Sequence, residues 1–201
     1  MSGRHLVRNS HYRRLLVART VSNLGNGIAP IALAFGVLAL PGATPTSLSL
    51  VLAAQAVPLV VMLPIGGVIA DRLGRARVIA VTDIVLSAFV MTTAVLFLTG
   101  TATVPLLIGL SFVSGVLNGL WWPAFPGLVP DVIKDEGLLQ PANAYVSVGS
   151  NAGLIVGNAV GGVLVAAFGS GIAIAIDAMT FFVAGLLVFS FRSVSKPHDS
   201  G

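Results

Sequence analysis

The feature that most constrains this chain is a series of long apolar runs separated by short breaks. A helix needs about 20 mostly apolar residues to cross a hydrocarbon core. Six runs are long enough, and they cover approximately residues 15–40, 48–70, 78–99, 104–126, 141–168 and 171–191. The runs do not alternate apolar with polar residues, as the strands of a membrane barrel do. We therefore predict an all-α membrane protein with a bundle of six transmembrane helices.

The composition agrees with a membrane protein. Charged residues make up only 9% of the 201 residues, and 56% are hydrophobic. An ordinary soluble domain is about one quarter charged, so a soluble fold of this size would lack the side chains to cover its surface. The chain has no cysteine, and its histidines, His5, His11 and His198, lie in the terminal tails. We therefore expect no disulfide, no metal site and no cofactor.

The basic residues predict the orientation in the membrane. With six spans, all eleven lie on or near one side, and the other three loops contain none. They are Arg4, Arg8, Arg13, Arg14, Arg19, Arg72, Arg75, Arg77, Lys134, Arg192 and Lys196. Because positive charge marks the cytoplasmic side, we expect a cytoplasmic tail at 1–14, a bundle at 15–191 and a cytoplasmic tail or linker at 192–201. The net charge of +4 thus reports membrane orientation, and we expect no nucleic acid as a partner.

The first span and the absence of catalytic motifs limit the functions available. The first apolar run exceeds the 7–15 residues of a signal-peptide core and no A-x-A site follows it, so we expect a retained helix. The sequence contains no G-x-x-x-x-G-K-[ST] loop for nucleotide phosphates. It also has no plausible Ser-His-Asp set. We therefore predict that this chain is not an enzyme.

Most of the internal charge lies in one segment, GGVIADRLGRARV at 66–78, between the second and third runs. In such a turn Gly67 permits close backbone approach and Gly74 permits a positive φ. Asp71 is placed to face helix-terminal N–H groups, and the arginines mark the inner face. A generic cytoplasmic loop would also contain arginines, but without this glycine and aspartate spacing.

The segment resembles the G-x-x-x-D-R-x-G-R-[RK] loop between helices two and three of the major facilitator superfamily. The match falls on Gly67, Asp71, Arg72, Gly74 and Arg75, and Arg77 adds the usual further positive charge. The resemblance implies the amino-terminal, six-helix half of that fold. It also implies that this loop is a conformational latch, in which Asp71 holds two halves closed on the cytoplasmic side.

Three further segments resemble the drug, macrolide and siderophore efflux branch of this superfamily. They are HYRRLLVARTVSNLGNGIAPIAL at 11–33, QAVPLVVMLPIGG at 55–67 and PANAYVSVGSNAGLIVGNAVGGVLVAAFG at 141–169. The resemblance implies a multi-pass protein of the plasma (inner) membrane that exports a small hydrophobic or amphiphilic compound in exchange for protons. Its partners would be the lipid bilayer, that compound, protons, and a carboxy-terminal half or a second copy. Uptake by symport and a non-transporting scaffold or degenerate fragment are the alternatives.

The fifth run contains a glycine at every fourth position. Such a small-residue stripe lets two helices pack closely in lipid, and its members are Gly149, Gly153, Gly157 and Gly161, with Gly162 beside them. The antiporter signature of the superfamily has a Gly-Pro pair here, whereas this chain has Gly157-Asn158. Plain helix packing explains the stripe equally well, and in an isolated half the stripe is expected to be an unpaired docking face.

Polar residues inside apolar runs are the candidates for a transport pathway, because they are costly in lipid unless paired or wetted. The candidate amides are Asn23, Asn26, Asn118, Asn151 and Asn158, and interhelical hydrogen bonds are the alternative role for each. Asp177 lies deep in the last run and is the candidate proton carrier, with a local structural hydrogen bond as the alternative. Asp83 is expected to pair with a loop arginine and Arg19 to extend toward the interface. Trp121 and Trp122 are expected to be interfacial anchors.

Overall fold

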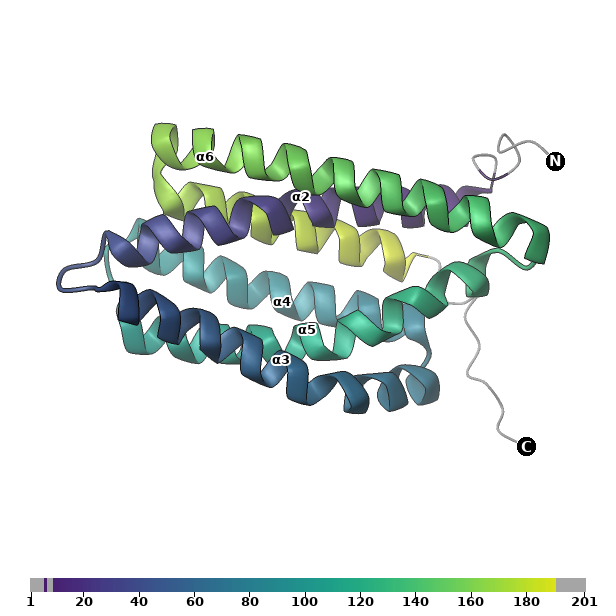
Figure 1. The fold of residues 1–201 in the computed structure, drawn as a ribbon, viewed down its shortest axis with the longest axis horizontal. Helices are drawn as coiled ribbons and strands as arrows, with labels where there is room; N and C mark the ends of the chain where they lie inside the picture. The colour runs from purple at the N-terminus through teal and green to yellow at the C-terminus, as the bar shows by residue number, and fades with distance from the viewer. Residues whose placement is uncertain (1–5, 7–8, 191–201) are drawn as a thin grey trace.

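The computed structural model describes residue 6 and residues 9–190. The described chain folds into five α-helices, and each is long and apolar enough to cross a membrane. They are α2 (Ser10–Leu38), α3 (Pro45–Leu73), α4 (Arg75–Leu98), α5 (Val104–Val132) and α6 (Glu136–Phe189) (Figure 1). The predicted tail at 192–201 and the residues Arg4, His5, Arg8, Arg192, Lys196 and His198 lie outside the described part.

The longest helix, α6, turns back on itself. Within its 54 residues one residue, Gly169, has non-helical dihedrals, with φ 81° and ψ 167°. A straight helix of this length would extend about 80 Å, whereas a hydrocarbon core is about 30 Å thick. Figure 1 shows the first arm, 136–168, reversing at the left of the view into the second arm, 170–189. The break between the runs predicted at 141–168 and 171–191 is therefore a single glycine, whose positive φ other residues rarely adopt.

Every helix extends beyond its predicted span at one end or both, as α2 and α5 illustrate. α2 begins at Ser10 rather than near 15, because the side chain of Asn9 caps it by accepting from the backbone N–H groups of His11 and Tyr12. α5 continues to Val132, so the break predicted at 127–140 shrinks to 133–135. The sequence there contains Pro130, but membrane helices tolerate proline when neighbours satisfy the freed backbone groups.

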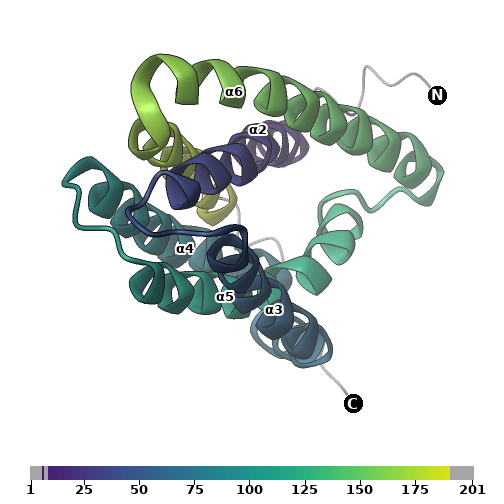
Figure 2. The ribbon, with the colours of Figure 1, turned by 60° about the vertical axis from the view of Figure 1, so that its left-hand side comes forward.

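The helices form two layers joined by α4. α2 packs mainly against α6, and α3 packs mainly against α5, whereas α4 contacts both α6 and α5. Direct contact of α2 with α3 or α5 is sparse. Figure 2 shows α6 and α2 above and α5 and α3 below, with α4 between them. We call these pairs the α2–α6 layer and the α3–α5 layer.

The glycine stripe lies inside the α2–α6 layer. A Cβ added at Gly157 would lie 3.1 Å from the Cα of Gly27, and one at Gly161 would lie 3.0 Å from the Cα of Ile28. Gly149 and Gly153 also contact α2, whereas Gly162 faces open space. The expectation that the stripe is an unpaired docking face is therefore wrong, because α2 of the same chain covers it.

One end of the bundle gathers the start of α2, the end of α3, the start of α4, the end of α5 and the start of α6. This end lies on the right of Figure 1. It contains the α3–α4 turn at Gly74, and we call it the turn end.

Candidate functional site

The charged segment forms a tight connection at the turn end. α3 ends at Leu73, Gly74 has φ 89°, and α4 begins directly at Arg75. Arg72 and Arg77 are exposed, whereas Arg75 is half-buried. The three arginines therefore have different surroundings despite their closeness in sequence.

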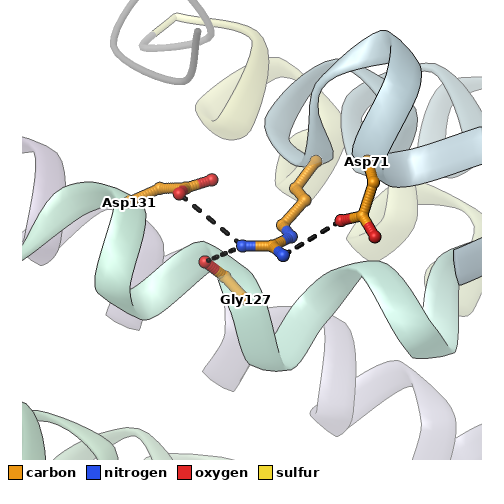
Figure 3. Close-up of polar contacts among 4 residues, drawn as sticks. Asp71, Gly127 and Asp131 are labelled. Carbon is orange, nitrogen blue, oxygen red and sulfur yellow. Dashed lines mark hydrogen bonds and ion pairs between the residues drawn. The ribbon is translucent and has the colours of Figure 1, made fainter. Parts of the chain in front are cut away.

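Arg75 joins three helices at this end (Figure 3). Its Nη2 donates to Oδ1 of Asp71 at 3.0 Å, at the end of α3. Its Nη1 donates to the backbone carbonyl of Gly127 at 3.3 Å and lies 3.7 Å from Oδ1 of Asp131, both on α5. We call Arg75, Asp71 and Asp131 the outer charge cluster. It fixes the turn to the last turns of α5.

Two expectations about this segment are corrected. Asp71 does not face helix-terminal N–H groups, and α4 has no side-chain cap. Asp71 is still part of α3 and lies four residues before Arg75, so its carboxylate meets the guanidinium instead. The close backbone approach occurs at Gly66 rather than Gly67. A Cβ on Gly66 would lie 2.8 Å from the Cα of Leu120, whereas one on Gly67 meets only a proline side chain at 3.8 Å.

A cavity of about 180 Å³ lies between the two layers, and all five helices contribute to its lining. Most of the lining is apolar, and its polar members are Asn26, Gln55, Thr93, Ser111, Ser114, Asn118 and Asp177. Sequence reasoning missed Gln55, although an amide in the otherwise apolar run 48–70 was a usable signal. The cavity has neutral hydrogen-bonding groups and one carboxylate, with no cationic side chain among its lining residues.

The predicted pathway amides separate into two groups. Asn26 and Asn118 line the cavity, and Asn23 is buried next to Asn26, whose Nδ2 donates to its Oδ1 at 3.4 Å. Asn151 and Asn158 are exposed and do not line the cavity. The glycine stripe explains this, because it turns one face of the first arm of α6 toward α2 and leaves both amides on other faces.

Asp177 is buried where α6 packs against α2. Its side chain is 1% exposed and its Oδ1 has no hydrogen-bond partner among the described residues. It lies so close to Gly25 that a Cβ there would overlap its Oδ1. The hydroxyl of Thr180 donates to the backbone carbonyl of Asp177 at 2.8 Å, not to the carboxylate. An unpaired acid that lines a cavity in an apolar bundle is costly, and such residues mark functional positions by default.

A second charge cluster lies inside the bundle. The Cζ of Arg19 on α2 lies 4.6 Å from the ring centroid of Trp121 and 4.3 Å from that of Phe125, both on α5. The two rings stack with centroids 5.1 Å apart. Asp83 on α4 is 1% exposed and interacts electrostatically with Arg19 and Trp121. We call Arg19, Trp121, Phe125 and Asp83 the inner charge cluster.

This cluster corrects three expectations. Arg19 does not extend to the interface, because aromatic rings attract its guanidinium into the bundle. Asp83 faces Arg19 rather than a loop arginine. Trp121 is only 7% exposed, so it is not an interfacial anchor, whereas Trp122 is 54% exposed. The described residues contain no group of three or more metal-ligating side chains.

Comparisons with known proteins agree with this architecture. A family model described as transmembrane secretion effector matches residues 2–199. The uncharacterized MFS-type transporter YfiS of Bacillus subtilis (strain 168) is 27% identical over 175 residues, which are 87% of this chain and 40% of the relative.

A second relative from the same organism gives the same result. The uncharacterized MFS-type transporter YkuC is 27% identical over 188 residues, which are 93% of this chain and 43% of the relative. The chain thus spans about two fifths of the length of these relatives. The comparisons confirm the predicted superfamily. This chain is a multi-pass membrane protein that belongs to the transmembrane secretion effector family of the major facilitator superfamily.

Proposed function

We propose that the chain forms a six-helix half of a secondary transporter that exports a small hydrophobic or amphiphilic compound in exchange for protons. The observation that carries the proposal is the cavity between the two layers, in which an unpartnered carboxylate, Asp177, lies among amides and apolar side chains. Mostly apolar pockets with a few placed polar groups are typical of sites for small molecules.

Six crossings follow if each arm of α6 spans the membrane once. The arms at 136–168 and 170–189 have the length for this, since about 20 apolar residues suffice. The start of α2 and the arginine-rich turn then lie on one face. The excess of arginine at that face supports a cytoplasmic turn end in the plasma (inner) membrane, with both termini on the same side.

The outer charge cluster supports the role of a latch. Asp71 and Arg75 are partly exposed at the turn end, where a second six-helix half would dock. That half would come from further polypeptide or from a second copy, consistent with relatives more than twice as long. Breaking these contacts as the transporter opens inward would let the two halves separate at this face.

Asp177 is the proposed proton carrier. The cavity places Asn26, Gln55 and Asn118 around the same space, so a compound with donor and acceptor groups would find partners there. A proton or a positively charged ligand would neutralise the carboxylate, which otherwise has no counter-charge in the cavity lining. If Asp177 binds either a proton or the ligand but not both at once, export of the ligand is coupled to entry of a proton.

The test is dye accumulation in cells that produce the full transporter. We expect lower steady-state accumulation of ethidium, and of the neutral dye Nile red, than in cells lacking the protein. We expect Asp177→Asn to abolish the dependence of this difference on the proton gradient. Asp135→Asn is the matched control, because Asp135 is exposed in the α5–α6 connection and should leave transport unchanged.

The same assay separates the rival functions. Higher accumulation with the protein present would indicate uptake by symport. Equal accumulation of both dyes, in cells where the protein is inserted in the membrane, would favour a non-transporting scaffold. Proton-dependent export that persists in Asp177→Asn would remove this residue from the coupling mechanism.

A further inference from the structure

The inner charge cluster connects the two layers at a place where they otherwise make little contact. Arg19 belongs to the α2–α6 layer, and the rings of Trp121 and Phe125 belong to the α3–α5 layer. Because α2 and α5 pack sparsely against each other, this cation–aromatic contact is a principal link between them. We call it the Arg19 bridge.

The bridge lies between the cavity and the turn end. With a rise of about 1.5 Å per residue, Arg19 is about 14 Å from the start of α2 at Ser10 and Trp121 is about 17 Å from the end of α5 at Val132. The cavity residues of the same helices are deeper, since Asn26 is about 24 Å and Asn118 about 21 Å from those ends. Movement from the cavity to the turn end along α2 and α5 therefore passes the bridge.

A buried apolar cluster lies between the bridge and the turn end. Leu15 and Ala18 of α2 belong to the same buried cluster as Trp121, Ala124 and Leu128 of α5. Along α2, Arg19 lies farther from the turn end than Leu15 and Ala18 and nearer to the cavity. The bridge and the apolar cluster thus both lie between the cavity and the turn end.

The polar groups of the inner charge cluster are incompletely paired. Nε of Arg19 is buried without a hydrogen-bond partner among the described residues, whereas the Asp83 carboxylate interacts with the side chain of Trp121. A purely structural buried network is normally saturated with hydrogen bonds. Because Nε of Arg19 makes no hydrogen bond in this arrangement, movement of the guanidinium off the rings breaks no hydrogen bond at that atom.

We infer that Arg19 is a positioning residue of an internal gate: its contact with Trp121 and Phe125 holds α2 against α5 and closes the cavity toward the turn end. Asp83 attracts the guanidinium into this position, and release of the bridge opens that path. The inference deepens the proposed transport function and rests on it for its purpose.

The test measures access to the cavity with a cysteine label. The 201 residues contain no cysteine, and Ser114 lines the cavity with a half-buried side chain, so Ser114→Cys introduces a single reporter. Membrane vesicles of both orientations, containing the full chain, are treated with a membrane-impermeant maleimide. A cysteine placed instead at the exposed Arg77 identifies the membrane face of the turn end.

We expect Arg19→Gln to increase the labelling rate from the turn-end face about thirtyfold, which corresponds to about 2 kcal/mol for a desolvated cation–aromatic contact. Arg19→Lys keeps the charge without the planar guanidinium and should restore part of the closure. Arg13→Gln is the matched control, since it removes the same charge from an exposed position on α2, and its labelling should equal that of the parent.

Labelling of Arg19→Gln at the parental rate would overturn the inference. An equal increase from both faces would also overturn it, because that result reports a loosened fold rather than a gate. If Arg19→Gln does not accumulate, Phe125→Leu decides, since it removes one ring and keeps Arg19 and Asp83. A turn-end-specific increase in that variant supports the gate, and an unchanged rate refutes it.

Together with the labelling experiment, the dye assay distinguishes failure of the gate from failure of the proposed transport function. If neither dye is transported by the parent protein but Arg19→Gln opens the turn-end face, the gate stands and the transport proposal fails. If the parent exports dye and Arg19→Gln leaves labelling unchanged, the transport proposal stands and the gate fails.

Discussion

The close packing of α2 on α6 predicts a sharp difference between two glycines of the same helix arm. A methyl group at Gly157 would overlap the backbone carbonyl oxygen of Leu24 and lie 2.9 Å from its carbonyl carbon and 3.1 Å from the Cα of Gly27. These neighbours are backbone atoms, so they yield only if the two helices separate. At Gly162 the same methyl group meets nothing within 4 Å.

The magnitude follows from comparing the two alanine variants. Replacing a helical glycine by alanine gains about 1 kcal/mol of helix propensity at either site, and this gain cancels in the comparison. Overpacking of a filled interface costs about 1–3 kcal/mol. We therefore expect Gly157→Ala to have a free energy of unfolding about 1–3 kcal/mol below that of Gly162→Ala.

The assay is reversible denaturant unfolding of both variants in the same lipid bicelles, followed by circular dichroism. We expect Gly162→Ala to match or exceed the parent and Gly157→Ala to fall below Gly162→Ala. Equal stability of the two variants would refute the packing described for the glycine stripe. Both glycines lie in the same arm of α6, and the main difference between them is that Gly157 faces the backbone of α2 whereas Gly162 faces open space.

Two further predictions concern the turn end. Arg75→Gln should reduce dye export at least about tenfold, the loss that corresponds to about 1.4 kcal/mol, because it removes the contacts from α4 to Asp71 on α3 and to Asp131 on α5. Arg77→Gln should keep export near the parental level, because Arg77 is exposed. Equal loss in both variants, measured at matched membrane abundance, would contradict a specific role for the outer cluster. Gly66→Ala should lower the unfolding free energy by about 1–3 kcal/mol relative to Gly67→Ala, measured in the same denaturant assay, and the reverse order would contradict the observed α3–α5 packing.

The sequence predicted the helical membrane architecture because apolar length and loop charge are local properties. The six apolar runs correspond to the helices and to the two arms of α6, and the chain reverses at Gly169 within the predicted break. Helix ends were less predictable. The capping of α2 by Asn9 and the continuation of α5 through its prolines depend on contacts that a hydropathy pattern does not contain.

Side-chain partners were predicted least well, because they depend on which faces meet. Asn26 and Asn158 are equally polar in sequence, yet one lines the cavity and the other is exposed. Arg19 and Asp83 were each assigned a nearby loop or interface, but the fold brings them toward each other across separate helices. Only the packing of α2, α4 and α5 determines that outcome.

The two charge clusters at different depths suggest an order of events in the proposed cycle. The side chains of Arg75 and Asp71 are 35% and 61% exposed, so dissolved ions and a docked second half can compete for them directly. Arg19 is half-buried and lies on aromatic rings about 14 Å from the start of α2, so dissolved ions screen it less. A partner at the membrane face would therefore break or form the ion pairs of the outer cluster. The contact of Arg19 with Trp121 and Phe125 would break only when α2 separates from α5. Opening toward the turn end would then begin with the outer contacts and be completed at Arg19, which keeps the cavity closed until both have changed.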